Sequence, residues 1–340
     1  MTGYADLDRR LPSSAERWQG EEFAAELIEW IGGVVGPVRS LEQVKLRVWA
    51  SVWVAETDDR RFYAKQNCEL QGFEAALVAM LAELVPDRVV PVAASDPRRG
   101  LLLTTDQGRV LGDATADDDL DAWERVLVAG AELQRELEPH AVRLSELGLT
   151  TLAPADASGY AEQRLDELSS LPETHPMVLT RDEADALEAT LPAVRGWAEE
   201  VAALGLPVTL NHNDLHDNNV FAVGESLRFF DFADSLLTEP LAVLLIPLHM
   251  LSHRLDAGPD DPRLWRLADA ALELWSDRAP LAELRSALPA ALQLARLGRV
   301  ESWARCCTSM SDAELDEWGN TVPRWLSTLL LDPPVGHVRR

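Results

Sequence analysis

The sequence predicts an α+β fold with two unequal parts, a small lobe built on an antiparallel sheet and a larger, mostly helical lobe. Between residues 40 and 105, short segments rich in β-branched and aromatic residues alternate with turns, which is typical of strands. From about residue 115 onward, apolar residues recur every three or four positions, as in amphipathic helices, and a single short hairpin interrupts them. We therefore divide the chain into residues 1–105 and 106–340.

The first part is expected to contain a leading helix over residues 1–35, then a sheet and one main helix. Three strands are predicted in "QVKLRVWAS", "SVWVAET" and "RFYAK", with the turn "TDDR" between the last two. The main helix is predicted in "QGFEAALVAMLAEL", because Phe73, Leu77 and Leu81 fall at helical spacing. Strand character returns in "RVVPVAAS" and "GLLLTT".

The composition is that of a globular protein with an acidic surface. Of 340 residues, 47% are hydrophobic, and 31 basic against 57 acidic residues give a net charge of -26. Such a surface repels phosphate backbones, so no nucleic-acid partner is expected. It would suit a cationic ligand, although an acidic surface more commonly reflects solubility.

Cysteine usage and hydropathy predict a cytoplasmic protein that does not associate with membranes. Three cysteines, two of them adjacent, make neither a disulfide framework nor a zinc knuckle, which favours a reducing compartment. The N-terminal segment lacks the apolar core of a secretory signal, and the run "LAVLLIPLHML" is too short to span a bilayer. The oligomeric state is left open.

The stretch "LNHNDLHDNNVF" concentrates histidine, aspartate and asparagine in one short segment. Two apolar runs, 220–223 and 227–230, follow around a Gly-containing turn and predict a hairpin. Pairing these runs brings Asn219 beside Asp231, and Asp214 lies on the loop that enters the same end. Carboxylate and amide oxygens suit a hard divalent cation such as Mg²⁺.

Other chemistries fit the same stretch less well. A helical zinc site would use two histidines at i and i+4, as in H-E-x-x-H, but position 213 is Asn instead of Glu. A calcium loop starting at Asp214 or Asp217 lacks its Gly and its terminal Glu. An Asn- and Asp-rich turn explains one or two of these residues, but not the whole pattern. A phosphoryl-transfer loop explains it best.

The segment "HNDL", with an asparagine four residues later, resembles the kinase catalytic loop H-R-D-L-x-x-x-N, and "DFA" resembles D-F-G. More specifically, "HNDLHDNNVF" and "FFDFAD" resemble the H-G-D-L-H-x-x-N and D-[FW]-x-D pattern of the aminoglycoside phosphotransferase and choline-kinase-like family. His216 and Asp234 match that family in particular. The resemblance implies a bilobal, protein-kinase-like fold and transfer of the γ-phosphate of ATP or GTP, with Mg²⁺, to a hydroxyl of a small molecule.

The resemblance also implies roles for the motif residues. Asp214 would accept the proton of the acceptor hydroxyl, or orient that hydroxyl, while Asn219 and Asp231 would hold Mg²⁺. His212 and His216 would support the loop.

The first lobe would supply the nucleotide-binding half. Lys65 stands in the place of the lysine of V-A-I-K, and Glu74, with Glu69 as its rival, would pair with this lysine beside the phosphates. Ser51 would touch phosphate. The backbone of the linker between the lobes would hydrogen-bond the adenine, which implicates Thr104, Thr105, Asp106 and Gln107.

Some positions depart from the family pattern. The turn between the first two strands, in "LRVWASVWVAE", has no Gly-rich loop, so Trp49, Ala50 and Ser51 would have to replace its amides. Asn213 and Ala233 stand where glycines are usual. A pseudokinase that binds nucleotide without transfer is therefore an alternative, and a protein kinase is a weaker one because no A-P-E segment follows the "DFA" motif.

The acceptor is expected to be a small molecule with a hydroxyl group, and a cationic antibiotic or amino sugar is one class that would imply antibiotic resistance. Asp234 and Glu239 are candidate ligands for such a cation. The tryptophans of the C-terminal helices are interpreted as core residues, because core positions are commoner for tryptophan than an aromatic cage. They are Trp265, Trp275, Trp303, Trp318 and Trp325.

Overall fold

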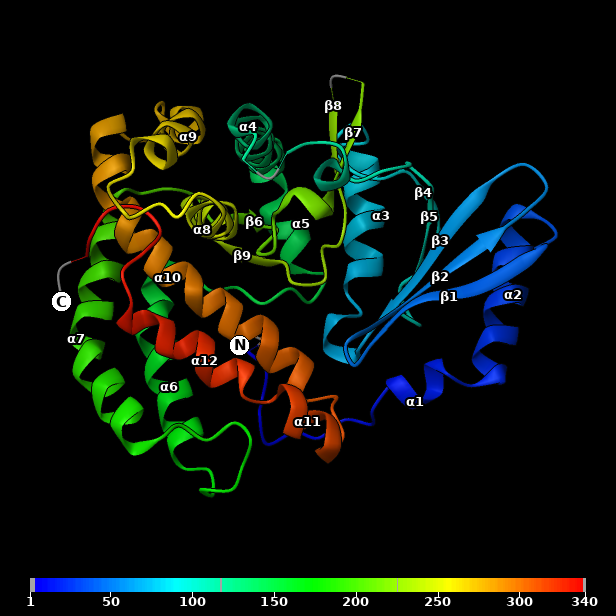
Figure 1. Ribbon diagram of the computed structural model, residues 1–340, viewed down its shortest axis with the longest axis horizontal. Coiled ribbons are helices and arrows are strands. Elements are labelled where there is room, and N and C mark those ends of the chain that lie inside the picture. Colours follow the sequence, from blue (N-terminus) through cyan, green and yellow to red (C-terminus); the bar gives the residue numbers. More distant parts are fainter. Residues whose placement is uncertain (1–3, 117, 225, 339–340) are drawn as a thin grey trace.

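The protein is described by a computed structural model that covers residues 4–116, 118–224 and 226–338. It has two lobes, a small one around a β-sheet and a larger one of packed helices (Figure 1). This architecture confirms the predicted α+β bilobal fold. The division at residue 105, where the last strand of the sheet ends, stays a prediction for the extent of each lobe.

The sheet of the small lobe has five antiparallel strands in the order β1-β2-β3-β5-β4. Its main helix, α3 (Glu74–Leu84), and the N-terminal helix α2 (Glu21–Val35) lie on opposite sides of the sheet (Figure 1). The strands are β1 (Ser40–Arg47), β2 (Ala50–Glu56), β3 (Arg61–Asn67), β4 (Val92–Asp96) and β5 (Leu101–Thr105).

Alternation along the strands separates the two faces of this sheet. Trp53, Phe62 and Leu103 pack with α2 in one hydrophobic core. Leu102 points to the other face and joins Leu77 of α3 in the core of the larger lobe. The second face is therefore the one that looks into the cleft between the lobes.

The predicted leading helix is wrong for residues 4–14, while residues 1–3 of that prediction lie outside the described residues. The structure has a short α1 (Ala15–Trp18) followed by α2, and residues 4–14 form no helix. The amide of Leu11 donates to the carbonyl of Thr308 at 2.7 Å, so this segment packs on the large lobe. Pro12 and Gly20 account for the breaks, since proline removes a backbone donor and glycine favours a helix boundary.

The large lobe is built around α10 (Leu281–Cys307), a 27-residue helix that is buried on almost every side. From residue 287 to its end, every residue of this helix except Trp303 is buried, so polar side chains there must find partners inside the protein. Every helix within the described residues is too short or too polar to cross a lipid bilayer. The other α-helices are α4 (Leu120–Leu137), α5 (Ala141–Ser145), α6 (Ala157–Ser169), α7 (Arg181–Ala203), α8 (Leu245–Arg254), α9 (Pro262–Leu272), α11 (Asp312–Trp318) and α12 (Thr321–Ser327).

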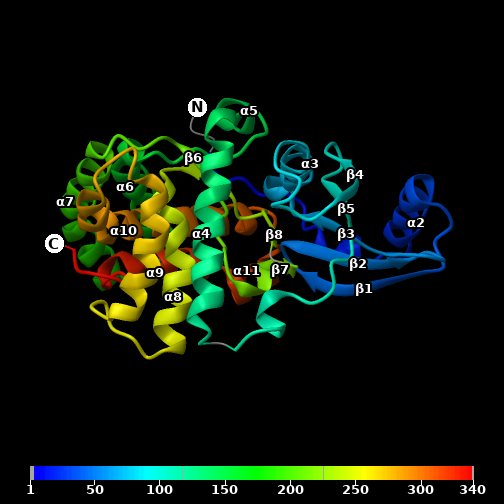
Figure 2. The same cartoon turned by 90° about the horizontal axis from the view of Figure 1, so that it is seen from above.

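The large lobe also contains two short pairs of strands. β6 (Thr209–Asn211) pairs with β9 (Leu236–Thr238), and β7 (Val220–Val223) pairs with β8 (Ser226–Phe229). The β7–β8 hairpin lies between the lobes in both views (Figures 1 and 2). The hairpin is confirmed, but its register differs by one residue from the prediction.

The observed hairpin register still places Asn219 near Asp231, as expected. Val220 lies opposite Phe229 and Val223 opposite Ser226, which leaves a two-residue connection instead of three. The amide of Phe230 donates to the carbonyl of Asn219 at 3.1 Å. Asn219 therefore stands at the open end of the hairpin, next to the residue that precedes Asp231.

Candidate active site

The loop between β6 and β7 turns sharply at Asn213, whose φ of 62° lies in the left-handed region. Asparagine tolerates this region better than other residues that carry a Cβ. Its side-chain Nδ2 also donates to the carbonyl of Gly298 at 2.9 Å and to that of Asp234 at 3.1 Å. Asn213 thus fills the place of the expected glycine and adds two hydrogen bonds to α10 and to the segment after Asp231.

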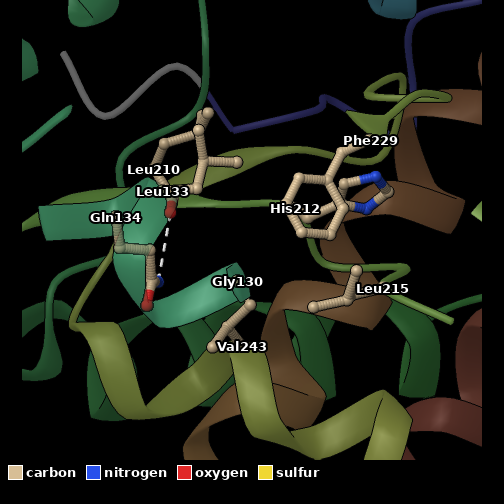
Figure 3. A pocket seen from close by; sticks show the side chains of 8 residues that line it. All are labelled: Gly130, Leu133, Gln134, Leu210, His212, Leu215, Phe229 and Val243. Atoms are coloured by element: carbon tan, nitrogen blue, oxygen red, sulfur yellow. Dashed lines mark hydrogen bonds between the residues drawn. The ribbon is translucent and has the colours of Figure 1, made fainter. Parts of the chain in front are cut away.

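His212 lies beneath the loop and supports it. Its Nε2 is 2.9 Å from the carbonyl of Phe230, and its ring centroid is 4.6 Å from that of Phe232. Burial lowers the pKa of this histidine, which favours a neutral ring. It lines a small, mostly apolar cavity of about 10 Å³. Figure 3 shows it there with Leu215 and with Gly130 of α4.

Asp214 points into the cleft and faces two basic side chains. Its carboxylate lies 3.2 Å from Arg299 Nη1 and 3.6 Å from His216 Nε2. Burial would raise the pKa of Asp214, but Arg299, and then His216, outweigh it and hold that pKa well below its usual range. Asp214 is therefore an ionised carboxylate with a fixed orientation.

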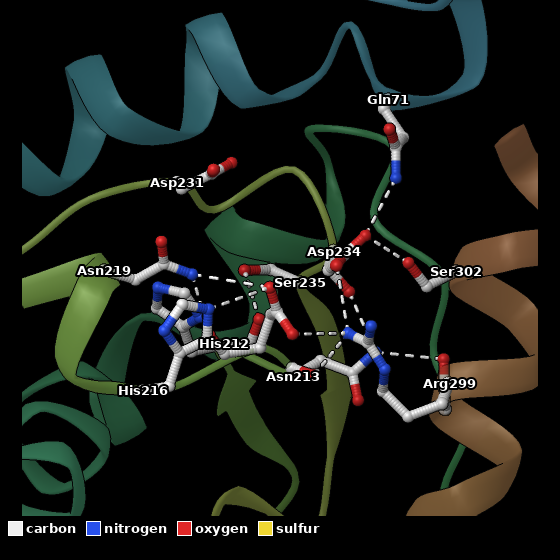
Figure 4. A network of polar contacts seen from close by, with 12 residues as sticks. Gln71, His212, Asn213, His216, Asn219, Asp231, Asp234, Ser235, Arg299 and Ser302 are labelled. Atoms are coloured by element: carbon white, nitrogen blue, oxygen red, sulfur yellow. Dashed lines mark hydrogen bonds and ion pairs between the residues drawn. The ribbon is translucent and has the colours of Figure 1, made fainter. Parts of the chain in front are cut away.

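Asn219 and Asp231 both line the cavity into which Asp214 points. Asn219 Nδ2 donates to the carbonyl of Asp214 at 2.9 Å and to its Oδ2 at 3.4 Å. The amide oxygen of Asn219 is thereby directed toward Asp231 (Figure 4). Asp231 itself has a φ of 64° and forms an ion pair with Lys65.

This pair of side chains fits Mg²⁺. An amide oxygen and a carboxylate are hard oxygen ligands, and Mg²⁺ bound with nucleotide phosphates needs only one or two such protein ligands. Within the described parts of the chain, no group of three or more His, Cys, Asp or Glu is arranged to hold a metal ion. The donor set is thus too small for a cage made by the protein alone and suits a cation shared with phosphate oxygens.

The predicted Lys65–Glu74 ion pair is present in the structure. Lys65 Nζ lies 2.7 Å from Glu74 Oε2, and the same carboxylate accepts from the amide of Phe232 at 2.7 Å. Although burial would lower the pKa of Lys65, Asp231 and then Glu74 outweigh it and raise that pKa, so the ammonium stays charged. Glu69, the rival partner, instead pairs with Arg9 at 3.3 Å.

A cavity of about 330 Å³ lies next to Lys65, between the two lobes. Thr104 and Thr105 line it, as expected for the linker region. Asp106 and Gln107 are outside its lining, and the Gln107 side chain accepts from Arg228 at 2.8 Å. The cavity has an apolar wall of Val44, Val52, Val78, Val90, Leu102, Val110, Phe221 and Phe230.

The prediction that Ser51 contacts phosphate is wrong. Its hydroxyl is buried and accepts hydrogen bonds from Gln43 Nε2 at 3.0 Å and Trp53 Nε1 at 2.7 Å. Because successive side chains of a strand point to opposite faces, Ala50 and Val52 face the cleft while Ser51 faces the core shared with α2.

A second cavity of about 310 Å³ adjoins the first and contains Asp214, His216, Asn219 and Asp231 in its lining. Asp234 lines it too, and its carboxylate has three partners within the protein (Figure 4). It accepts from Gln71 Nε2 at 3.0 Å, from Arg299 Nη1 at 2.9 Å and from the hydroxyl of Ser302. Asp234 therefore organises the wall of the cavity, and its predicted contact with a cationic substrate stays a prediction.

Glu239 does not reach the cavity, so its predicted contact with substrate is wrong. Only 2% of the residue is exposed, and its Oε2 accepts from the amide of Leu241 at 2.6 Å at the start of a 3₁₀ helix (Pro240–Leu244). Burial raises the pKa of Glu239 to about 7. This side chain is a buried helix cap.

Arg299, which lines the second cavity, is not predicted from the sequence motifs. Arg299 touches Asp214, while Trp49 and Trp303 line the wall with their ring centroids 5.1 Å apart. A signal for Arg299 exists in the sequence, because polar residues at intervals of three interrupt an otherwise apolar helix. They are Arg296, Arg299, Ser302 and Arg305. Trp49 belongs to the turn that was expected near the phosphates, whereas Trp303, which was interpreted as a core residue, also lines this cavity.

Sequence comparison finds no matching protein-family model and no matching curated protein. Solved structures do match. A choline kinase from Streptococcus pneumoniae superposes with a TM-score of 0.54 and 15% identity, over 91% of this chain and 100% of that chain. The GDP complex of wild-type aminoglycoside 2'-phosphotransferase-IIIa gives a TM-score of 0.58 and 11% identity, over 91% and 99%.

An ethanolamine kinase from Plasmodium vivax also matches, with a TM-score of 0.57 and 12% identity, over 89% of this chain and 86% of that chain. The similarity extends through both lobes in each case, although few residues are identical. The chain therefore has the bilobal, protein-kinase-like fold that these choline, ethanolamine and aminoglycoside kinases share.

Proposed function

We propose that this protein transfers the γ-phosphate of ATP or GTP to a hydroxyl group of a small molecule. One observation carries the proposal. The Lys65–Glu74 pair of the small lobe contacts Asp231, and Asp231 lies beside Asn219 and Asp214 at the junction of two adjoining cavities. A nucleotide in the first cavity and a hydroxyl acceptor in the second would meet at that junction.

In this scheme Asp214 binds and orients the acceptor. Its ionised carboxylate lines the second cavity and is held by Arg299 and by the amide of Asn219. It would accept a hydrogen bond from the attacking hydroxyl and orient that hydroxyl toward the γ-phosphorus. A loose transition state needs little proton removal early in the reaction, so a weakly basic carboxylate suffices.

In the same scheme Lys65 binds the nucleotide. Glu74 and Asp231 fix its ammonium at the mouth of the first cavity, where it would bind the α- and β-phosphates. Asn219 and Asp231 would hold Mg²⁺, which neutralises charge on the phosphate oxygens when bound. Positioning and charge compensation of this kind account for most of the catalysis of phosphoryl transfer.

The acceptor is proposed to be a small hydroxylated molecule, with a cationic antibiotic or amino sugar as one class. The structurally similar proteins are named as kinases of choline, ethanolamine and aminoglycosides. The three cysteines are free and buried, which supports a reducing, cytoplasmic setting for this chain. A role in antibiotic resistance would follow only if an antibiotic proves to be the acceptor.

The test is formation of ADP or GDP with a panel of aminoglycosides, amino sugars and amino alcohols. We expect transfer by the natural chain, and a loss of kcat of about 10²-fold or more in Asp214→Asn and in Asp231→Asn. Asp121→Asn serves as the control, because its side chain is 93% exposed and distant in sequence from the motifs. Near-normal turnover in either of the first two variants would contradict the proposed roles.

A pseudokinase is the competing function. It would bind the nucleotide with Mg²⁺, as measured by calorimetry, and yet form no diphosphate with any acceptor of the panel.

A further inference from the structure

The distribution of lysine in this chain is unusual. Its 31 basic residues comprise two lysines, Lys45 and Lys65, and 29 arginines. Both lysines line the 330 Å³ cavity, and both also line the 310 Å³ cavity. Lys65 has a place in the proposed mechanism, whereas Lys45 has none so far.

A β-bulge puts Lys45 on the cleft face of the sheet. In the pairing of β1 with β2, Gln43 lies opposite Trp53 and Lys45 lies opposite Val52, so Val44 is an extra residue. Without this insertion Lys45 would lie opposite Ser51, whose side chain points to the core on the other face. Bulges re-aim side chains in this way, and here the result is that Val44 and Lys45 both line the cavity.

The register also places the two lysines in one row across the sheet. Lys45 lies opposite Val52 of β2, and Val52 lies opposite Lys65 of β3. Neighbouring strands are about 4.8 Å apart, so the two lysine backbones are separated by about 10 Å. A chain of two or three phosphates fits between ammonium groups carried at that spacing on flexible stems.

The two ammonium groups differ in their partners. Lys65 is held by Glu74 and Asp231, which compensate its charge. For Lys45, the described part of the chain provides no ion pair or hydrogen bond to the ammonium.

The turn from β1 to β2 lacks the glycines that would let backbone amides wrap phosphates, and the Ser51 hydroxyl points away from the cleft. We propose that Lys45 binds the outer phosphates of the nucleotide and so replaces a Gly-rich loop. The proposal rests on the proposed function only in its assumption that a nucleoside triphosphate occupies the first cavity.

The first experiment compares the affinities of ATP, ADP and AMP, and of the guanine series, for Lys45→Met by calorimetry. A charge-assisted contact to phosphate leads us to expect about tenfold or greater weakening for the triphosphate. The affinity for AMP should change by less than about twofold, since AMP lacks the outer phosphates. Lys45→Arg should restore most of the triphosphate affinity.

Arg47→Met is the matched control. It removes the same charge from the same strand, but Arg47 lies outside the lining of both cavities. If Arg47→Met weakens ATP binding as much as Lys45→Met does, the effect comes only from long-range electrostatics and the proposal is overturned. Equal weakening of ATP and AMP by Lys45→Met would also overturn it, because that pattern reports a structural role.

The second experiment uses the presence of only two lysines. Acetylation with a limiting amount of acetic anhydride, followed by peptide mass spectrometry, reports the accessibility of each amine. We expect Lys45 to react faster than Lys65 in the free protein, and ATP with Mg²⁺ to slow its reaction several-fold more than AMP does. An unchanged rate for Lys45 at saturating ATP would contradict the proposal.

The outcomes separate this inference from the proposed function. If ATP and GTP fail to bind the natural chain, the proposed function falls and the inference falls with it. If nucleotide binds tightly and Lys45→Met leaves that affinity unchanged, the inference alone is wrong.

Discussion

At the scale of single residues, backbone conformation explains a departure from the family pattern. Asn213 and Asp231 both have positive φ, and they stand at the two segments that meet in the site. For Asn213, a glycine would offer the same backbone freedom but none of the side-chain hydrogen bonds to Gly298 and Asp234. Asparagine at position 213, where the family pattern has glycine, is therefore compatible with the loop geometry.

Glu239 gives a prediction of pH-dependent stability. Its carboxyl ionises at 4.5 in the reference state and at about 7 in the folded protein, where burial raises the pKa. The folded state thus keeps a proton that the unfolded chain loses, so this residue makes stability fall as pH rises from about 4.5 to about 7. Glu239→Gln can keep the cap on Leu241 without the buried charge.

We expect Glu239→Gln to be more stable than the natural chain at pH 8 by about 2 kcal/mol, and to show a smaller gain at pH 5. Urea denaturation at both values measures the difference. A gain that is equal at the two pH values would rule out ionisation of Glu239 as its cause.

At the scale of elements, α10 reaches the site with a row of polar side chains. Arg299 Nη1 donates to the carbonyl of Asn213 at 2.7 Å and pairs with both Asp214 and Asp234. Arg305 donates to the carbonyls of Asp234 and Ser235. This helix therefore holds the loop between β6 and β7 and the segment after β8 at once, which its sequence periodicity alone does not reveal.

Arg299→Met is predicted to impair turnover more than nucleotide binding. The change frees the Asp214 carboxylate and removes a hydrogen bond to the loop, so kcat should fall about tenfold or more while the KM for nucleotide changes less. Arg299→Lys keeps the charge but not the planar guanidinium, so its kcat should lie between those of the natural chain and Arg299→Met. Steady-state kinetics would refute this role if kcat were unaffected in Arg299→Met.

At the scale of the whole molecule, the N-terminal segment ties the two lobes together. The amide of Ala5 donates to Glu301 Oε1 at 2.9 Å, and Arg164 Nη2 bonds both the carbonyl of Ala5 and Glu301 Oε2. Tyr160 donates to the same carboxylate at 2.9 Å. The chain then leaves this buried cluster and enters α1 and α2 of the small lobe (Figure 1).

Removing the charge of Glu301 should destabilise the fold. Both Glu301 and Arg164 have fully buried side chains, and breaking such a pair leaves an uncompensated charge. We expect Glu301→Gln to lower the free energy of unfolding by about 3 kcal/mol, as measured by chemical denaturation. Glu162→Gln, which removes a solvent-exposed pair with Arg195, should change it by less than about 1 kcal/mol. Similar losses in the two variants would contradict the importance of burial.

Much of the fold and of the motif geometry could be predicted from the sequence, because the signals are local. The strands of the small lobe, the hairpin and the Lys65–Glu74 pair depend on spacing along short segments, and each is present in the structure. The predictions for Ser51 and Glu239 were wrong because the motif does not specify side-chain direction. The direction of Ser51 depends on which face of the strand it occupies, and Glu239 turns back to cap a helix.

The sequence by itself determined the bilobal fold class and the identity of the motif residues, since periodicity and motif spacing are written along the chain. Only the tertiary structure decided which side chains share the cleft. Arg299 and Trp303 arrive there on a helix about 85 residues beyond the loop, and Lys45 faces it because of one bulged residue. Such contacts come from packing and strand register, which bring together residues that no local pattern connects.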